Sequence, residues 1–137
     1  MSENNVDHPV DTLMASLGLV RVVSSDAEAG RATLEFNARP DQCHSGNIVQ
    51  GGFVTGWIDA AMANALIAKT GGTMLPLSLD INVAFHAAAR PGLVHAEAWV
   101  ERLGKRTAFV EGRLITPDGE MIAKGMSTVR LVPANRG

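Results

Sequence analysis

Apolar residues recur at helical spacing in two segments of the first half of the chain. The first segment runs over Pro9 to Leu17 and would be ended by Gly18. The second runs over about Gly52 to Thr70 and is apolar almost all round, with Asp59 near its middle. A helix without a polar face has to be enclosed by the rest of the protein. The pattern therefore predicts a short N-terminal helix and one central, enclosed helix.

After the second helix the apolar period changes from helical to alternating. Every second residue between Leu77 and Phe85 is apolar, which predicts a strand with Leu77 and Leu79 on one face and Ser78 and Asp80 on the other. The other predicted strands are Leu19–Ser24, Arg31–Asn37, Leu93–Leu103, Arg106–Thr116 and Glu120–Val132. Short turns join the last three, so the sheet is expected to be antiparallel.

One antiparallel sheet and one enclosed helix predict an α+β fold in which the sheet curls around the helix. Residues 39–52 have an irregular pattern and predict a loop that leads into this helix. No repeat, low-complexity tract or linker interrupts the sequence. Residues 1–137 are therefore expected to form a single domain, with residues 1–17 as an N-terminal extension.

Composition narrows the class of protein. Of the 137 residues, 46% are hydrophobic and 19% are charged, which is typical of one compact soluble domain. Cys43 is the only cysteine, so neither an intrachain disulfide nor a cysteine-based zinc site can form, and a reducing compartment is expected. The N-terminus has neither a basic start nor an apolar run, and the central helix carries Asp59 and Asn64. We therefore expect a cytoplasmic protein that does not enter a membrane.

The charge distribution bears on the choice of ligand. A net charge of −2 without Lys/Arg-rich runs argues against a nucleic-acid-binding protein. Residues 1–80 are net acidic, whereas residues 81–137 are net basic. A basic half suits a small polyanion such as a nucleotide phosphate, although ordinary surface variation would give the same pattern.

Asp59 is the strongest candidate for chemistry. An ionised group inside an enclosed apolar helix costs several kcal/mol unless it is paired or hydrogen-bonded. One explanation is a structural carboxylate that caps a neighbouring loop, and the other is a functional group. A functional carboxylate could attack a carbonyl itself or deprotonate a water that does so.

The absence of several catalytic motifs limits the kinds of bond that the protein could cleave. The sequence has no tyrosine, no Gly-x-Ser-x-Gly elbow, no P-loop and no Gly-x-Gly-x-x-Gly run. Its histidines, His8, His44, His86 and His95, show no metal-ligand spacing, so we expect neither a metal nor another cofactor. A thiolate leaves with little need of a proton donor, since the pKa of a thiol is about 8.5. A thioester is therefore the bond that suits these residues.

Four motifs, in their order and spacing, resemble those of a known enzyme family. They are residues 44–52 (HSGNIVQGG), Asp59, residues 78–82 (SLDIN) and residues 104–109 (GKRTAF). From about residue 18 to residue 132 the chain resembles the hotdog-fold acyl-CoA thioesterases, specifically the phenylacetate-pathway (PaaI) type of the 4-hydroxybenzoyl-CoA thioesterase superfamily. Two positions depart from the family pattern, because Gln50 stands where many members have His and His44 where they commonly have Asn or Gln.

The resemblance implies a hotdog fold and hydrolysis of an acyl-CoA thioester. Asp59 would then be the nucleophile or general base, and Ser78 would orient the attacking water or the acid. Arg102, Lys105 and Arg106, at a predicted hairpin, would bind the phosphates of coenzyme A. A solvated strand hydroxyl and ordinary surface charges are the alternative explanations for these four polar residues.

The start of the central helix offers donors for an oxyanion. Its free N–H groups and dipole favour negative charge, and Gly51 and Gly52 leave room for a substrate. Gln50 could add a side-chain N–H, but Gln50 and His44 could equally be polar loop residues. Gly51 and Asp59 are eight residues apart, roughly 12 Å along a helix, yet both must approach one acyl group. We therefore expect a site shared across a homodimer at least, with a homotetramer as the larger alternative.

Two other functions stay open on the sequence alone. An enoyl-thioester hydratase or dehydratase of the same fold would need a His paired with an acid, and His44 with Asp59 could only just serve. A non-catalytic acyl-CoA-binding module is the second, because Gln50 replaces the family His. The side chains that could either line an acyl pocket or belong to the core are Phe53, Trp57, Met62 and Leu66.

Overall fold

The computed structural model describes residues 9–134, with side chains from residue 12 onward, so His8 lies outside the described residues. Its helices and strands are α1 (Pro9–Leu17), β1 (Leu19–Asp26), β2 (Arg31–Ala38), β3 (Cys43–His44), β4 (Ile48–Val49), α2 (Gly51–Lys69), β5 (Met74–Phe85), β6 (Gly92–Leu103), β7 (Thr107–Ile115) and β8 (Met121–Pro133). Each predicted helix and strand is present, with its ends shifted by a few residues at most.

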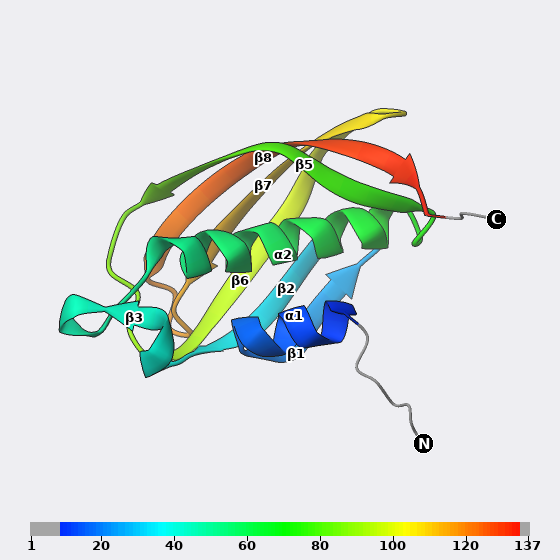
Figure 1. The fold of residues 1–137 in the computed structure, drawn as a ribbon. Coiled ribbons are helices and arrows are strands. Elements are labelled where there is room, and N and C mark those ends of the chain that lie inside the picture. Colours follow the sequence, from blue (N-terminus) through cyan, green and yellow to red (C-terminus); the bar gives the residue numbers. More distant parts are fainter. Residues whose placement is uncertain (1–8, 135–137) are drawn as a thin grey trace, which may run out of the picture.

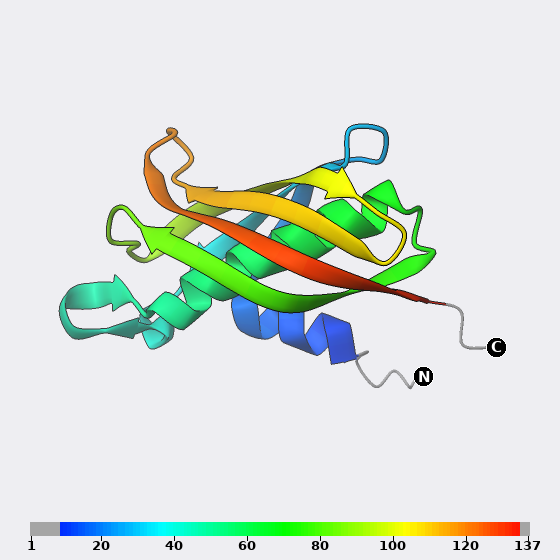
Figure 2. The same cartoon turned by 90° about the horizontal axis from the view of Figure 1, so that it is seen from above.

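An antiparallel sheet wraps around α2. Within residues 9–134 the sheet has six strands in the order β1-β2-β6-β7-β8-β5, and every neighbouring pair is antiparallel. Figure 1 shows the sheet curving over the helix, and Figure 2 shows β5 at one edge of the sheet. The predicted α+β architecture is confirmed.

The core lies between α2 and the inner face of the sheet. Trp57, Met62 and Leu66 of α2 are at most 1% exposed, which places them in the core rather than in an acyl pocket. The ring of Trp57 stacks on Phe36 of β2, with the centroids 5.8 Å apart. Burying side chains of this size stabilises the fold by about 1.5–3 kcal/mol each. This apolar contact fixes α2 against the sheet.

One stripe of α2 stays partly uncovered, contrary to the prediction of a fully enclosed helix. Gly56, Asp59 and Ala63 are half-buried, and Ile67 is 40% exposed. Gly56 lies against Leu17 of α1, whereas Asp59 contacts β5, so the stripe runs between these two elements. Asp59 therefore lies at a surface of the single chain and not in its interior.

A bulge in β5 reverses the predicted faces of part of this strand. Ser78 and Asp80 pair with neighbouring residues of β8, so Leu79 is an extra residue in the ladder. The side chain of Ser78 consequently points to the inner face, and Leu77 lies on the outer face, 52% exposed. The prediction that Ser78 and Asp80 share a face is wrong, because strict alternation holds only in an unbroken ladder. The bulge is held by a hydrogen bond of 2.9 Å from the Thr128 N–H to Asp80 Oδ1.

The segment before α2 is a compact loop, as predicted. It contains two single-turn 3-10 helices, Pro40–Gln42 and Ser45–Asn47, around the short ladder of β3 and β4. Gly46 has a φ of 71°, in the left-handed region where glycine is favoured. The loop places Gln50 at the start of α2.

Within the described residues, no helix is long and apolar enough to span a membrane.

Candidate active site

The carboxylate of Asp59 and the hydroxyl of Ser78 meet at the side of α2 that faces β5. Ser78 Oγ donates a hydrogen bond of 3.0 Å to Asp59 Oδ1. The bulge allows this contact, since it turns Ser78 toward the helix. In the single chain Asp59 is half-buried and Ser78 is exposed, so the pair is accessible from the edge of the sheet. With Oδ1 held by Ser78, Oδ2 is the oxygen that can act on a substrate or a water.

The N-terminus of α2 presents one unused donor. Gln50 is the N-cap, and its side-chain Oε1 accepts a hydrogen bond of 2.9 Å from the Gly52 N–H. The Gln50 carbonyl accepts a second bond, from the Phe53 N–H at 3.0 Å. Among residues 9–134, no acceptor binds the N–H of Gly51. Gly51, rather than Gly52, therefore has the free N–H that an oxyanion needs.

A hollow of about 430 Å³ opens beside Gly51. Its wall is mostly apolar and includes Phe85 and residues 87–89, while His44 and His86 are its polar members. A Cβ on Gly51 would come within 3.3 Å of the Phe85 ring, so glycine lets this ring lie against the start of α2. The hollow can hold an apolar group whose carbonyl oxygen points at the Gly51 N–H.

Gly51 and Asp59 are not brought together within one chain. Both belong to α2, and their eight-residue separation corresponds to about 12 Å along the helix. The strand residues beside them, Phe85 and Ser78, are likewise far apart along β5. The two residues lie in one helix, as predicted, and a single chain does not place them beside one common acyl group.

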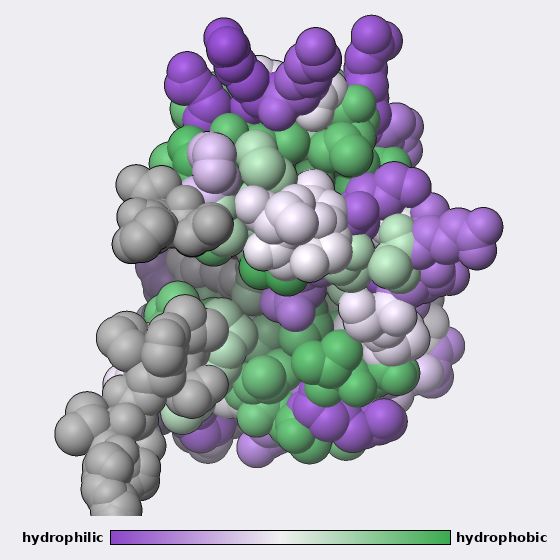
Figure 3. All heavy atoms as spheres, turned by 90° about the vertical axis from the view of Figure 1, so that its right-hand side faces the viewer, coloured by the Kyte–Doolittle hydropathy of each residue, from purple (hydrophilic) through white to green (hydrophobic). Residues whose placement is uncertain are grey.

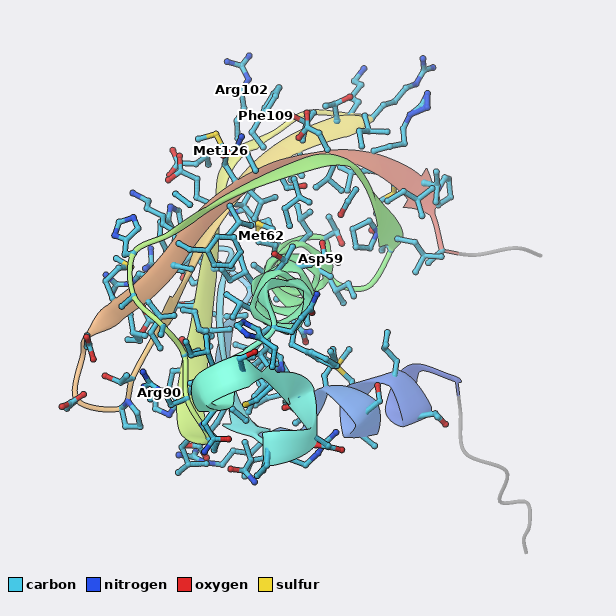
Figure 4. The ribbon with its side chains drawn as sticks, turned by 60° about the vertical axis from the view of Figure 1, so that its left-hand side comes forward. Asp59, Met62, Arg90, Arg102, Phe109 and Met126 are labelled. Carbon is cyan, nitrogen blue, oxygen red and sulfur yellow. The ribbon has the colours of Figure 1, made fainter. Side chains whose placement is uncertain are left out.

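The three basic residues predicted to bind phosphates lie at the turn between β6 and β7. Arg102, Lys105 and Arg106 are all exposed, and Figure 3 shows hydrophilic side chains projecting together over this end of the molecule. Arg102 pairs with Phe109 of β7, and Figure 4 shows both on the opposite side of the sheet from Asp59. The structure therefore does not bring Arg102 and Asp59 together within one chain.

The sequence model of one protein family matches more than half of the chain. This family is the thioesterase superfamily, and the match covers residues 46–123, which include Gly51, Asp59 and Ser78. The chain belongs to the thioesterase superfamily. It is accordingly a thioester hydrolase. No protein with a curated description matches the chain in sequence.

Solved structures show the same fold as this thioesterase. A phenylacetic acid degradation-related protein from Ralstonia eutropha JMP134 is 26% identical, with a TM-score of 0.81 and 93% of each chain covered. A point mutant of the phenylacetic acid degradation protein PaaI from Thermus thermophilus is also 26% identical, with a TM-score of 0.76 over 88% of this chain and 98% of that one. The PaaI protein of E. coli is 18% identical and shares the fold, with a TM-score of 0.80 over 89% of this chain and 85% of that one. The resemblance to PaaI-type hotdog thioesterases is confirmed.

Two residues beside the candidate site are not predicted from the sequence. Phe85 packs against Gly51, and Gln42, which is only 2% exposed, accepts a backbone hydrogen bond from Gln50. The contact of Phe85 depends on the end of a distant strand, and Gln42 is one polar residue in an irregular segment, so neither has a local signal. Among the residues that the structure describes, no group of three His, Cys, Asp or Glu side chains could hold a metal ion.

Proposed function

We propose that this thioesterase hydrolyses acyl-CoA thioesters at sites that two subunits share. The proposal rests on the separation of two groups on α2. Ser78 holds the Asp59 carboxylate eight residues, about 12 Å along the helix, beyond Gly51, whose N–H is free. Joining the carboxylate of one subunit to the amide of the other completes a site that one chain leaves in halves. A homodimer then contains two such sites, related by symmetry.

The outer edge of β5, with which no other strand of residues 9–134 pairs, supports this assembly. β5 has 12 residues, lies at the end of the sheet and carries both site neighbours, Ser78 and Phe85. A long unpaired edge is a ready template for pairing with another strand. Antiparallel pairing of β5 with its copy would bring the Ser78 end of one strand to the Phe85 end of the other. Asp59 would then face the partner subunit's Gly51.

The reaction requires a nucleophile and a donor for the carbonyl oxygen. Asp59 Oδ2 attacks the thioester carbon itself, or it takes a proton from a water whose oxygen attacks that carbon. In both routes an electron pair of the C=O bond moves onto oxygen, where the N–H of the partner subunit's Gly51 stabilises the charge. Collapse of the tetrahedral intermediate breaks the C–S bond and releases coenzyme A as a thiolate. In the first route a water then hydrolyses the acyl–Asp59 anhydride.

The hollow beside Gly51 is the space for the acyl group. Its lining is apolar apart from His44 and His86, which suits a small, aryl or medium-chain acyl group. The basic turn with Arg102, Lys105 and Arg106 supplies positive charge for the coenzyme A phosphates. The single, unpaired Cys43 fits a cytoplasmic enzyme.

The first experiment measures thiol release from a panel of acyl-CoA thioesters. Gly51→Pro is the sharpest variant of the oxyanion donor, because proline removes the N–H yet is tolerated at the first residue of a helix. Gln50 already has φ −63° and ψ 137°, which a following proline allows. Gly51→Ala is the matched control, since it adds the same Cβ beside Phe85 and keeps the N–H. We expect about a hundredfold lower kcat in Gly51→Pro than in Gly51→Ala.

A second experiment tests whether the site is shared. Asp59→Asn and Gly51→Pro homodimers should both be nearly inactive. A heterodimer of the two places both defects in one site and leaves the other site intact, so it should recover up to about half of the wild-type activity. Verified heterodimers that stay inactive would contradict the shared site.

A further inference from the structure

We infer that Gln42, a buried residue outside the reacting groups, is a positioning residue that fixes the direction of the Gly51 N–H. The inference rests on the proposed function, since it concerns the oxyanion donor of that site. Gln42 is 2% exposed, although it lies in the loop between β2 and α2 (Figure 1). A buried amide is costly unless its hydrogen bonds are made, so its partners show what it holds in place.

The main chain of Gln42 holds the residue that precedes the oxyanion donor. Its carbonyl accepts a hydrogen bond of 2.9 Å from the Gln50 N–H. The carbonyl of Gln50 is in turn bound by the Phe53 N–H at 3.0 Å. Gln50 is therefore tied at both its N–H and its C=O. The peptide plane that carries the Gly51 N–H includes this C=O, so these two bonds set where the free N–H points.

The side chain of Gln42 anchors the loop to α1. Its Nε2 donates to the carbonyls of Ser16 and Leu17, at 3.1 and 3.4 Å, and its Oε1 accepts from the Arg39 N–H at 2.9 Å. Both amide hydrogens and the amide oxygen are thus used. The carbonyls at the end of a helix lack partners within that helix, so the end of α1 is a fixed acceptor for this amide.

These contacts give α1 a role in catalysis although it carries no reacting group. The end of α1 is itself held by Trp57 of α2, whose Nε1 donates to the Leu17 carbonyl at 2.7 Å. The chain of contacts runs from α2 through Leu17 and Gln42 to Gln50, at the start of α2. An oxyanion donor must be aimed before the charge forms, because its contribution depends on preorganisation. Without the Gln42 amide, the loop loses the anchor that directs Gly51.

The test is a double-mutant cycle with the oxyanion donor. Gln42→Met keeps the length of the side chain and removes its donors and acceptor. We expect it to lower kcat about tenfold or more and to change KM by less than about twofold, because misplacement affects the transition state most. In a Gly51→Pro background the same change should lower kcat by less than about threefold, since the donor that Gln42 directs is already absent.

Controls separate positioning from general stability. Arg39→Ala removes side-chain bonds to the same end of α1, at Ala15 and Ser16, without touching Gln50, and it should keep wild-type kcat. Gln42→Glu is the second variant, for the case that Gln42→Met does not fold. It keeps the shape of the side chain, but a carboxylate cannot donate to the two carbonyls, so kcat should fall in the same way. Circular dichroism melting curves ensure that each variant is folded at the assay temperature.

The outcomes distinguish this inference from the proposed function. Turnover by the wild-type chain and its loss in Gly51→Pro test the proposed function and do not involve Gln42. Three results would overturn the positioning role of Gln42. The first is an equal loss of kcat from the Gln42 substitution in the wild-type and Gly51→Pro backgrounds. The others are an unchanged kcat, or an equal loss of kcat in Arg39→Ala. A loss confined to the background that retains the Gly51 N–H would establish it.

Discussion

Ser78 gives the Asp59 carboxylate a fixed orientation. Its hydroxyl holds Oδ1 at 3.0 Å, and a hydrogen bond to an ionised oxygen is stronger than one between neutral groups. The remaining oxygen then has one direction in which to act. This orientation matters at a half-buried position, where a free carboxylate would sample several rotamers.

Substitution of Asp59 tests its role in the chemical step. Asp59→Asn should lower kcat at least about a hundredfold with little change in KM, because an amide keeps the shape but loses the basic, nucleophilic oxygen. Ser78→Ala should lower kcat less, since the carboxylate remains. Steady-state kinetics with one acyl-CoA measure both effects. Asn64→Ala, in the same helix, is the control, and near wild-type turnover by Asp59→Asn would remove Asp59 from the mechanism.

Glu35 on β2 makes stability depend on pH away from the site. Its carboxylate lies 2.8 Å from the His95 ring of β6 and 3.2 Å from Arg21 Nε of β1. The hydrogen bond with His95, and then the charge of Arg21, hold the pKa of Glu35 below its usual range. A carboxyl with a lowered native pKa stabilises the fold above its unfolded pKa and loses this contribution as the pH falls through the native pKa.

Denaturant unfolding of Glu35→Gln measures this contribution. At neutral pH the variant should be less stable than the wild type, because the amide carries no charge for Arg21. The difference should shrink as the pH falls below about 4.3, the ordinary carboxyl pKa, toward the lowered native value. A difference that stays constant as the pH falls through the acid range would show that the ionisation of Glu35 does not matter.

At the scale of the element, β5 shows where the sequence is informative and where it is not. The apolar alternation predicts the strand, and the spacing of Gly51 and Asp59 on one helix predicts a divided site, because both follow from local geometry. The side on which Ser78 lies cannot be predicted this way. It depends on the register with β8, where Asp80 binds the Thr128 N–H and makes Leu79 an extra residue.

The turn between β6 and β7 can be tested as a unit. Thr107, directly after the turn, pairs with Arg130 of β8, and Arg130 pairs with Leu77 of β5. The turn therefore lies at the end of the sheet that carries Ser78. Two strand spacings, about 10 Å, separate Thr107 from β5. Replacing the three basic residues Arg102, Lys105 and Arg106 together by Ala should raise KM for acyl-CoA more than it lowers kcat.

Salt and a truncated substrate provide the controls for this prediction. The wild-type KM should rise with ionic strength, because exposed charges are screened within about 8–10 Å at ordinary salt. An acyl-pantetheine thioester, which lacks the phosphates, should lose little activity in the triple variant. An equal loss with both substrates would argue against phosphate binding at this turn.

At the scale of the whole molecule, the bulge also fixes how two copies of β5 can pair. A two-fold axis perpendicular to the sheet places inner-face residues of one β5 opposite inner-face residues of its copy. Ser78 of one strand can therefore lie opposite Phe85 of the other. Because of the bulge, Leu79 and Asp80 together occupy one position of the ladder. The midpoint between Ser78 and Phe85 then falls at Asn82. Asn82 is exposed and would face its own copy across the axis.

A cysteine at position 82 therefore tests the proposed dimer directly. Opposed residues of an antiparallel pair have Cα atoms about 4.5–5.5 Å apart, within the range that a disulfide spans. Asn82→Cys should oxidise to a covalent dimer, seen on a non-reducing gel and reversed by a reductant. Ala84→Cys is the matched control: it lies on the same face, but four strand positions, about 13 Å, would separate it from its copy. Crosslinking of Ala84→Cys but not of Asn82→Cys would contradict this register, and with it the alignment of Asp59 with the partner subunit's Gly51.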